Sequence, residues 1–165
     1  MPRISNPAKS RLKRSGTIAA VAVVLVGGFE GLRTVAYRDV VGIPTICFGE
    51  TRGVKMGDKA TAEQCKGMLI DRLDEFSAGI DRCLPGNLPY PVYVAFLSVS
   101  YNIGTQAFCG SSMARKANAG DIPGACDALL LWDRATVAGV KVKIPGLTRR
   151  RVEERELCMQ HNRRA

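Results

Sequence analysis

The spacing of apolar residues predicts that most of this chain is helical. Residues 61–84 begin with Thr61 and Gln64, which fit a capping box, and stop before Pro85. Apolar side chains in this stretch recur every three or four residues, as on one face of a helix: Met68, Leu69, Leu73, Phe76, Ile80 and Cys83. Residues 90–103 are almost wholly apolar, which predicts a buried central helix. Shorter helices are expected over residues 29–38, 112–119, 122–135 and 146–160.

One stretch departs from the helical pattern. Residues 39–52 are rich in β-branched side chains and are interrupted by Gly42, Pro44 and Gly49, which predicts a small hairpin. A length of 165 residues suits one domain with a core of its own. The expected fold class is therefore α+β and mainly α, with a small β-hairpin element near the N-terminus and a helical lobe.

The N-terminus combines a basic flank with an uncharged apolar run. Residues 1–14 contain no acidic residue and five basic ones: Arg3, Lys9, Arg11, Lys13 and Arg14. Residues 17–29 carry no charge and are rich in Ala and Gly. This order is typical of a membrane-directed segment whose basic end stays in the cytoplasm. The run is short, because about 13 helical residues rise roughly 20 Å against a hydrocarbon core of about 30 Å.

Three interpretations of this segment remain open. It could be a cleaved signal peptide, although no convincing small-residue cleavage site follows the run. It could be a buried helix of the folded protein, which the basic residues just upstream fit poorly. It could also be an uncleaved anchor that later leaves the membrane. We expect this third behaviour, with residues 16–29 in reversible contact with the inner membrane.

Charge and cysteine content narrow the class of protein. The net charge of +9 favours polyanionic partners such as nucleic acid, anionic lipid or an acidic cell-wall polymer. Aromatic residues make up 6% and lie mostly in apolar runs, so we expect no nucleic-acid partner. The six cysteines include no Cys-x-x-Cys pair and His161 is the only histidine, so we expect no metal and no cofactor. An even cysteine count suits disulfides made in an oxidising compartment, with free core thiols as the alternative.

Glu30, Asp39 and Thr45 are the candidate catalytic residues. Cleavage of a glycosidic bond needs two carboxyl groups, one a protonated acid in an apolar setting and the other ionised in a polar setting. Glu30 has apolar neighbours in sequence, such as Phe29, whereas Asp39 follows Arg38 in a turn-like stretch. A threonine hydroxyl could hold a water beside Asp39. Spacing alone does not distinguish this arrangement from two solvated surface charges.

Residues 29–51, FEGLRTVAYRDVVGIPTICFGET, resemble the active-site segment of the phage-type lysozymes, glycoside hydrolase family 24. The family pattern is E-G-x-x-x-x-x-Y-x-D, followed by G-x-x-T and G-x-T. The resemblance continues through YVAFLSVSYNIG, AGDIPGACDALLLWDRA and GLTRRRVEERELC, and so covers about residues 29–160. The basic, Ala- and Gly-rich lead further resembles that of the signal-arrest-release endolysins of the same family.

This resemblance implies a phage-lysozyme-like fold and a muramidase activity. Such an enzyme cuts the β-1,4 bond between N-acetylmuramic acid and N-acetylglucosamine in peptidoglycan, with inversion, to lyse the host. By resemblance, Glu30 is the general acid, Asp39 positions or activates a water on the opposite face of the sugar, and Thr45 orients that water. Arg150 is a possible substrate contact.

The resemblance also implies how the chain is divided into domains and where in the cell the protein acts. Residues 1–29 would form the basic N-terminus and membrane segment, and residues 30–165 the catalytic domain. The protein would be a monomer that faces the periplasm from the inner membrane and then enters the soluble periplasm. A membrane-tethered protein that binds cell wall without cutting it remains the alternative.

The disulfide pairs implied by the resemblance are Cys47–Cys65, Cys83–Cys109 and Cys126–Cys158. Two departures from the family pattern bear on the site. Glu50 stands where many members have histidine, so a structural bond made by that histidine is in doubt. The apolar run contains no cysteine, so activation by thiol exchange from the anchor is not expected.

Overall fold

The structure is a computed structural model that describes residues 8–164. The first seven residues of the expected basic N-terminus, Arg3 among them, lie outside the described residues. The helices are α1 (Arg11–Arg14), α2 (Gly16–Glu30), α3 (Ala62–Asp81), α4 (Tyr90–Ile103), α5 (Thr105–Cys109), α6 (Ser112–Asn118), α7 (Ile122–Ala128) and α8 (Pro145–Met159), with 3-10 turns at Leu129–Leu131 and Gln160–Arg164. The strands form two antiparallel hairpins, β1 (Arg33–Arg38) with β2 (Pro44–Cys47) and β3 (Arg134–Val137) with β4 (Val140–Lys143).

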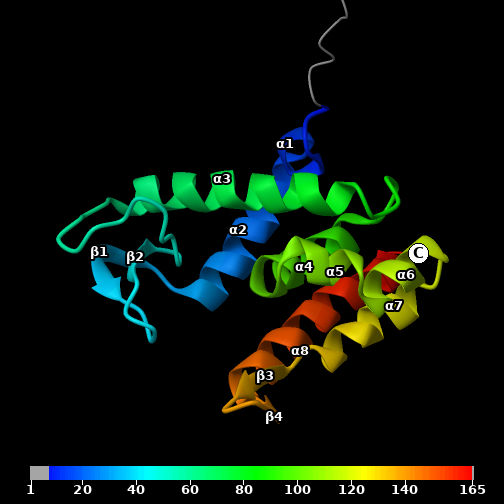
Figure 1. Cartoon of the computed structure of the whole chain (residues 1–165). Coiled ribbons are helices and arrows are strands. Elements are labelled where there is room, and N and C mark those ends of the chain that lie inside the picture. Colours follow the sequence, from blue (N-terminus) through cyan, green and yellow to red (C-terminus); the bar gives the residue numbers. More distant parts are fainter. Residues whose placement is uncertain (1–7, 165) are drawn as a thin grey trace, which may run out of the picture.

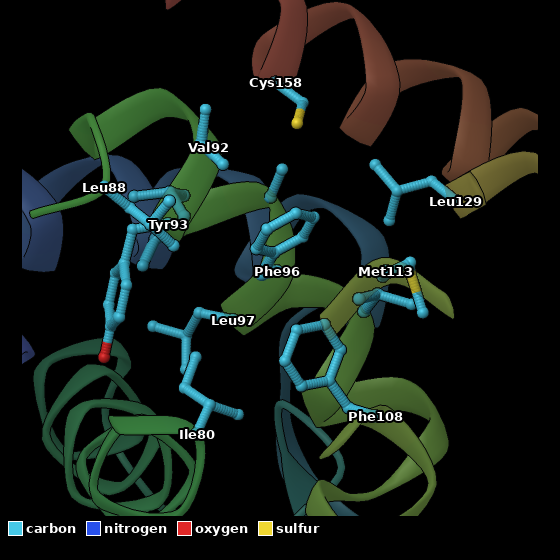
Figure 2. Packing of buried hydrophobic residues seen from close by; sticks show 14 of the residues in the cluster. Ile80, Leu88, Val92, Tyr93, Phe96, Leu97, Phe108, Met113, Leu129 and Cys158 are labelled. Atoms are coloured by element: carbon cyan, nitrogen blue, oxygen red, sulfur yellow. The ribbon is translucent and has the colours of Figure 1, made fainter. Parts of the chain in front are cut away.

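Helix α4 is the centre of the helical body, the name used here for helices α1 to α8. Its residues Pro91 to Ser100 are all buried, and α2, α3 and α8 pack around it (Figure 1). Figure 2 shows Phe96 and Leu97 of α4 packed among buried side chains from α3, α5 and α6. Full burial of each large side chain contributes about 1.5–3 kcal/mol, so this cluster dominates the stability of the body.

The hairpin lobe, residues 33–61, lies at one end of the molecule and contains β1 and β2 (Figure 1). Its core is small and consists of Ala36, Ile46 and Cys47 packed with Cys65 of α3. Helix α3 opens with the predicted capping box between Thr61 and Gln64 and runs from this lobe into the helical body. The lobe is therefore joined to the body by α3 on one side and by the end of α2 on the other.

Three disulfides join the pairs Cys47–Cys65, Cys83–Cys109 and Cys126–Cys158. These are the pairs that the family resemblance implied. The first ties β2 to α3, the second ties the end of α3 to α5, and the third ties α7 to α8. Each bridge thus links two elements that are adjacent in space but separated along the chain.

Two sequence predictions of secondary structure were wrong. Residues 29–38 are not a helix, because α2 ends at Glu30 and Gly31 turns the chain with a φ of +73° before β1 begins. The helix expected over residues 122–135 ends at Ala128, and a hairpin follows it. That hairpin turns at Ala138 and Gly139, both with positive φ, as a tight two-residue turn requires.

The N-terminal apolar run is part of the packed body in this structure. It forms α2, whose residues Ile18, Ala22 and Val26 are buried at four-residue spacing against the core. The expected boundary after residue 29 therefore falls inside the last turn of α2. Over residues 8–164, no helix has both the length and the apolar character needed to cross a bilayer.

Candidate active site

Glu30 is the last residue of α2, and its position is fixed by the way that helix ends. The N–H of Gly31 donates to the carbonyl of Gly27 at 3.0 Å, which closes the final turn. Since Val26 lies in the core, the next turn carries Glu30 to the rim of the body, where its side chain is 24% exposed. A helix buried along one face thus presents one carboxyl group at the surface that faces the hairpin lobe.

Arg150 of α8 holds the Glu30 carboxylate. Its guanidinium donates to Glu30 Oε1 at 2.7 Å, and the same group lies 4.7 Å from the centre of the Phe29 ring. The Arg150 side chain is only 9% exposed, so solvent screens this ion pair weakly. Arg150 stays a candidate substrate contact, and its ion pair with Glu30 places it at the candidate site.

Behind Arg150 lies a buried charged cluster on α8. Glu154 and Arg151 are fully buried, and their Oε2 and Nε atoms lie 2.6 Å apart. Glu154 Oε1 also accepts from Ser98 Oγ at 2.7 Å and lies 3.6 Å from Arg150 Nε. Burial raises the pKa of the Glu154 carboxyl against the pull of these partners. Arg151 further donates to Asn102 Oδ1, so the cluster anchors α8 to α4.

The surroundings of Glu30 differ from the apolar setting that its sequence neighbours indicated. Val26 points into the core, Phe29 packs against Arg150, and Leu32 lies beyond the helix end and is 45% exposed. The nearest partner of Glu30 is instead a cation. The residues adjacent to Glu30 in sequence did not predict its surroundings, because the helix turn and the glycine at its end send successive side chains in different directions.

Asp39 sits in the turn between β1 and β2, and its carboxylate organises that turn. Oδ1 accepts from the backbone N–H of Val41 at 3.0 Å and of Ile43 at 2.8 Å. The Asp39 N–H donates in turn to the Ile43 carbonyl at 3.0 Å. These bonds form an Asx turn, which holds the carboxylate by local contacts alone. Both side-chain bonds end on Oδ1, so Oδ2 is the oxygen that could hold a water.

Thr45 on β2 is linked to Asp39 through one residue. Its hydroxyl donates at 2.9 Å to the carbonyl of Ile43, whose N–H is bonded to Asp39 Oδ1. The side chain of Thr45 is almost fully buried, with 3% of the residue exposed. The hydroxyl hydrogen is thereby committed to Ile43, and the oxygen keeps lone pairs that can accept a hydrogen bond from water.

The loop after β2 brings the hairpin lobe to Glu30. A side chain built on Gly49 would lie 3.6 Å from Glu30 Oε2, and this glycine has a φ of +88°. Glu50 fixes the loop, because its Oε1 accepts from the backbone N–H of Thr51 and of Arg52 at 2.9 Å each. Glu50 also lies 3.7 Å from Arg72 Nε on α3. Glu50, which stands in place of the histidine of many family members, therefore anchors this loop through its carboxylate.

Tyr101 connects the loop after β2 to the helical body. Its hydroxyl, on α4, donates to the carbonyl of Phe48 at 3.3 Å. Burial, together with the nearby charge of Glu30, raises the pKa of Tyr101 to about 12. The hydroxyl therefore stays protonated and remains a hydrogen-bond donor at neutral pH.

The three candidates come from two separate parts of the molecule. Glu30 comes from the helical body and is held by Arg150, while Asp39 and Thr45 come from the hairpin lobe and share the peptide groups of Ile43. Sequence reasoning did not identify Ile43, whose contribution comes from its backbone. Among residues 8–164, no three His, Cys, Asp or Glu side chains gather as a metal site would require.

Comparison with known proteins points to one family. Residues 27–154 match the family model described as phage lysozyme. The chain is 40% identical over 145 residues to the SAR-endolysin of Pseudomonas phage phiKMV, covering 86% of this chain and 89% of that protein. It is 37% identical over 150 residues to the SAR-endolysin of Enterobacteria phage P21, covering 87% and 88%.

A solved structure shows the same fold at similar sequence distance. The endolysin from Escherichia coli O157:H7 phage FAHEc1 superposes with a TM-score of 0.82 at 32% identity, covering 93% of this chain and 97% of that one. The family match runs from the last turn of α2 into α8 and includes Glu30, Asp39, Thr45 and Arg150. On these grounds the chain belongs to the phage lysozyme family.

Proposed function

We propose that this protein is an endolysin of the muramidase type, which hydrolyses the β-1,4 bond between N-acetylmuramic acid and N-acetylglucosamine in peptidoglycan. The observation that carries the proposal is the placement of Glu30, a carboxyl group at the end of a helix buried along one face, facing a lobe that holds a second carboxyl group in a polar turn. Glycoside hydrolysis needs two carboxyl groups, and helix α2 and the hairpin lobe supply one each.

Glu30 acts as the general acid in this proposal. Arg150 holds Oε1 at 2.7 Å, which leaves Oε2, the oxygen beside Gly49, to donate a proton to the glycosidic oxygen. Gly49 lacks a side chain that would fill this space, so a sugar can approach. Arg150 then serves as a positioning residue that fixes which oxygen faces the substrate.

Asp39 and Thr45 act on the water molecule that attacks the sugar. Asp39 Oδ1 is occupied by two backbone N–H groups, and Oδ2 would position or activate a water on the face of the sugar opposite Glu30. Thr45, whose hydroxyl hydrogen is committed to the Ile43 carbonyl, would accept a hydrogen bond from that water and orient it. Attack from the opposite face gives inversion at the anomeric carbon.

The chemistry is tested on purified peptidoglycan with the full-length protein. We expect soluble fragments with N-acetylmuramic acid at their reducing ends, and NMR during the first turnovers should show the α-anomer. Fragments that end in reducing N-acetylglucosamine would contradict the bond assignment. Binding to peptidoglycan without release of reducing ends would favour the alternative of a tethered wall-binding protein.

We further propose that residues 16–29 deliver the enzyme as a releasable membrane tether. The basic flank of Arg3, Lys9, Arg11, Lys13 and Arg14 would start in the cytoplasm. Moving one charge outward against 100 mV costs about 2.3 kcal/mol, so five charges oppose exit by more than about 10 kcal/mol. This opposition vanishes on depolarisation, and a short Ala- and Gly-rich run gains little from lipid.

While the tether is in lipid, Glu30 is pinned at the bilayer surface and the enzyme is inactive. Fractionation before and after an uncoupler is added to expressing cells tests this. Full-length protein should move from the membrane to the periplasmic pool as lysis begins. Insertion of about four leucines within residues 19–26, which adds about 6 kcal/mol or more of apolar burial in lipid, should block release and lysis. A lengthened protein that stays bound and still lyses cells on schedule would show that the tether is not the switch.

A further inference from the structure

Residues 10–14, which precede α2, are seated on the helical body in an unusually specific way. Helix α1 has only four residues, far fewer than a helix needs to be stable on its own in water. Its placement therefore depends on contacts made elsewhere. Leu12 is 3% exposed and belongs to the main core cluster, and Ser10 is also buried.

The polar groups that receive α1 come from α3 and α4. Ser77 Oγ and Tyr93 Oη lie 2.6 Å apart, and Tyr93 donates to Asp81 Oδ1 at 2.7 Å. Onto this connected group α1 places two backbone donors, Leu12 N–H to Ser77 Oγ at 3.1 Å and Arg11 N–H to Asp81 Oδ2 at 2.8 Å. The first-turn N–H groups of a helix have no partner within it, so the body caps α1.

The charged side chains of this segment also meet complementary groups. The Arg11 guanidinium lies 4.6 Å from the centre of the Tyr93 ring and donates to the carbonyl of Leu88. Lys13 Nζ lies 3.0 Å from Asp74 Oδ2, and Ser10 Oγ donates to the other oxygen of the same carboxylate. Figure 2 shows Leu88 beside Tyr93, whose hydroxyl points away from the apolar cluster. The basic flank thus finds an acidic and aromatic docking surface on its own protein.

We infer that residues 10–14 are a latch that closes on Asp74, Ser77, Asp81 and Tyr93 only after the N-terminus has left the membrane. This rests on the proposed release, in which the latch starts on the cytoplasmic side while the docking surface is in the periplasm. Binding only to the released form pulls the equilibrium toward release.

The latch has a direct consequence for Glu30. Helix α2 runs without a break from Gly16, next to the latch, to Glu30, a span of about 22 Å. A closed latch fixes one end of this helix while its buried face, Ile18, Ala22 and Val26, fixes the rest. The latch therefore holds the catalytic carboxyl group in register with Arg150 and opposes return of the helix to lipid.

Variants of the docking surface test the latch without changing the basic residues that set membrane orientation. We would purify the released full-length form of Asp74→Asn combined with Asp81→Asn, and of Leu12→Ala, and digest each briefly with trypsin. Mass spectrometry would follow cleavage after Arg11 and Lys13. Both variants should be cleaved about tenfold faster than the unaltered protein, since proteolysis follows the population of the open form.

Two controls match these changes. Asp71→Asn alters an exposed carboxylate on the same helix α3, and Leu131→Ala alters a leucine that is 71% exposed. Both should be cleaved at the rate of the unaltered protein. A second readout is flotation with vesicles of phosphatidylethanolamine and phosphatidylglycerol, which should carry more of the latch variants than of the controls.

The outcomes separate the latch from the proposed function. Latch variants that are cleaved no faster than the controls would overturn the latch, whatever their activity. If Leu12→Ala does not fold, the paired aspartate variant still decides the question. Protein that is protected at Arg11 and Lys13 but releases no sugar from peptidoglycan would support the latch and count against the muramidase assignment alone.

Discussion

The helical body and the hairpin lobe hold their parts of the site by different means. Glu30 in the body stands at the end of a helix whose one face is buried, and Arg150 fixes its carboxylate from a second helix. Asp39 in the lobe is held by backbone N–H groups two and four residues away. The body thus positions its carboxyl group by tertiary packing, whereas the lobe positions its carboxyl group by local hydrogen bonds.

Because of this difference, we expect substitutions in the two regions to affect activity and stability differently. The lobe has a core of four buried residues, one of them supplied by α3, and depends on the Cys47–Cys65 bridge. Such a small core can open locally at a lower free energy than the body. Damage to the lobe should therefore reduce activity before it unfolds the protein, and damage to the body should do both together.

The largest effect is expected for the carboxyl group of the body. Glu30→Gln keeps an acceptor for Arg150 but cannot donate a proton to the glycosidic oxygen. Turbidity loss of outer-membrane-permeabilised bacteria should fall at least about a hundredfold, as is typical for removing a general acid. Glu153→Gln, an exposed change on α8, is the control. A near-normal rate for Glu30→Gln, at equal thermal stability, would remove Glu30 from the mechanism.

A loss of similar or slightly smaller size is expected for the carboxyl group of the lobe. Asp39→Asn preserves an oxygen for the turn bonds to Val41 and Ile43 but removes the charge, and should lower the rate by about a hundredfold. Asp39→Ala should be equally slow and also loosen the turn. Asp58→Ala is the control, because the Asp58 carboxylate also accepts a backbone N–H, that of Lys55, in a turn outside the candidate site. Activity retained in Asp39→Asn would leave Asp39 with a structural role only.

The disulfides allow the two regions to be broken one at a time. Serine pairs in place of Cys126 and Cys158 should cost about 3 kcal/mol and lower the melting temperature of the whole protein by roughly 10 °C. Serine pairs in place of Cys47 and Cys65 should instead lower activity with a smaller shift in melting temperature. Calorimetry beside the turbidity assay measures both. Equal losses of both quantities in the two variants would show that the lobe and body unfold as one unit.

The sequence predicted the long helices better than the strands for a physical reason. The helix over residues 61–84 has a capping box and a long apolar stripe, and the observed α3 follows both. Residues 29–38 have apolar residues at helical spacing by coincidence, and Gly31 decided the outcome because its positive φ ended α2. Residues 134–143 were missed because a turn of Ala138 and Gly139 carries a weaker signal than Asn-Gly.

The sequence predicted which residues form the candidate site but did not predict the contacts that hold them. The family pattern placed Glu30, Asp39 and Thr45 in one segment, and the structure distributes them over the end of α2 and the hairpin lobe. The pair between Glu30 and Arg150 joins residues 120 positions apart, so no local pattern contains it. The link through Ile43 is made by backbone atoms, which any residue could supply. Such contacts follow from the folded chain and have no signature in composition or spacing.

The smallest effect is expected for Thr45, where the hydroxyl and the methyl group can be separated. Thr45→Ser keeps the donor to the Ile43 carbonyl, so the rate should fall by about threefold or less, or no more than about 0.7 kcal/mol of transition-state free energy. The lost buried methyl group should cost about 0.8 kcal/mol of stability. Thr45→Val keeps the shape but removes the hydroxyl, and it should lower the rate about tenfold. Thr45→Ala should lower the rate by about the same factor or more. Thr34→Val, an exposed change on β1, controls for the loss of a strand hydroxyl. If serine and valine reduce the rate equally, packing in the lobe rather than the water contact explains the role of Thr45.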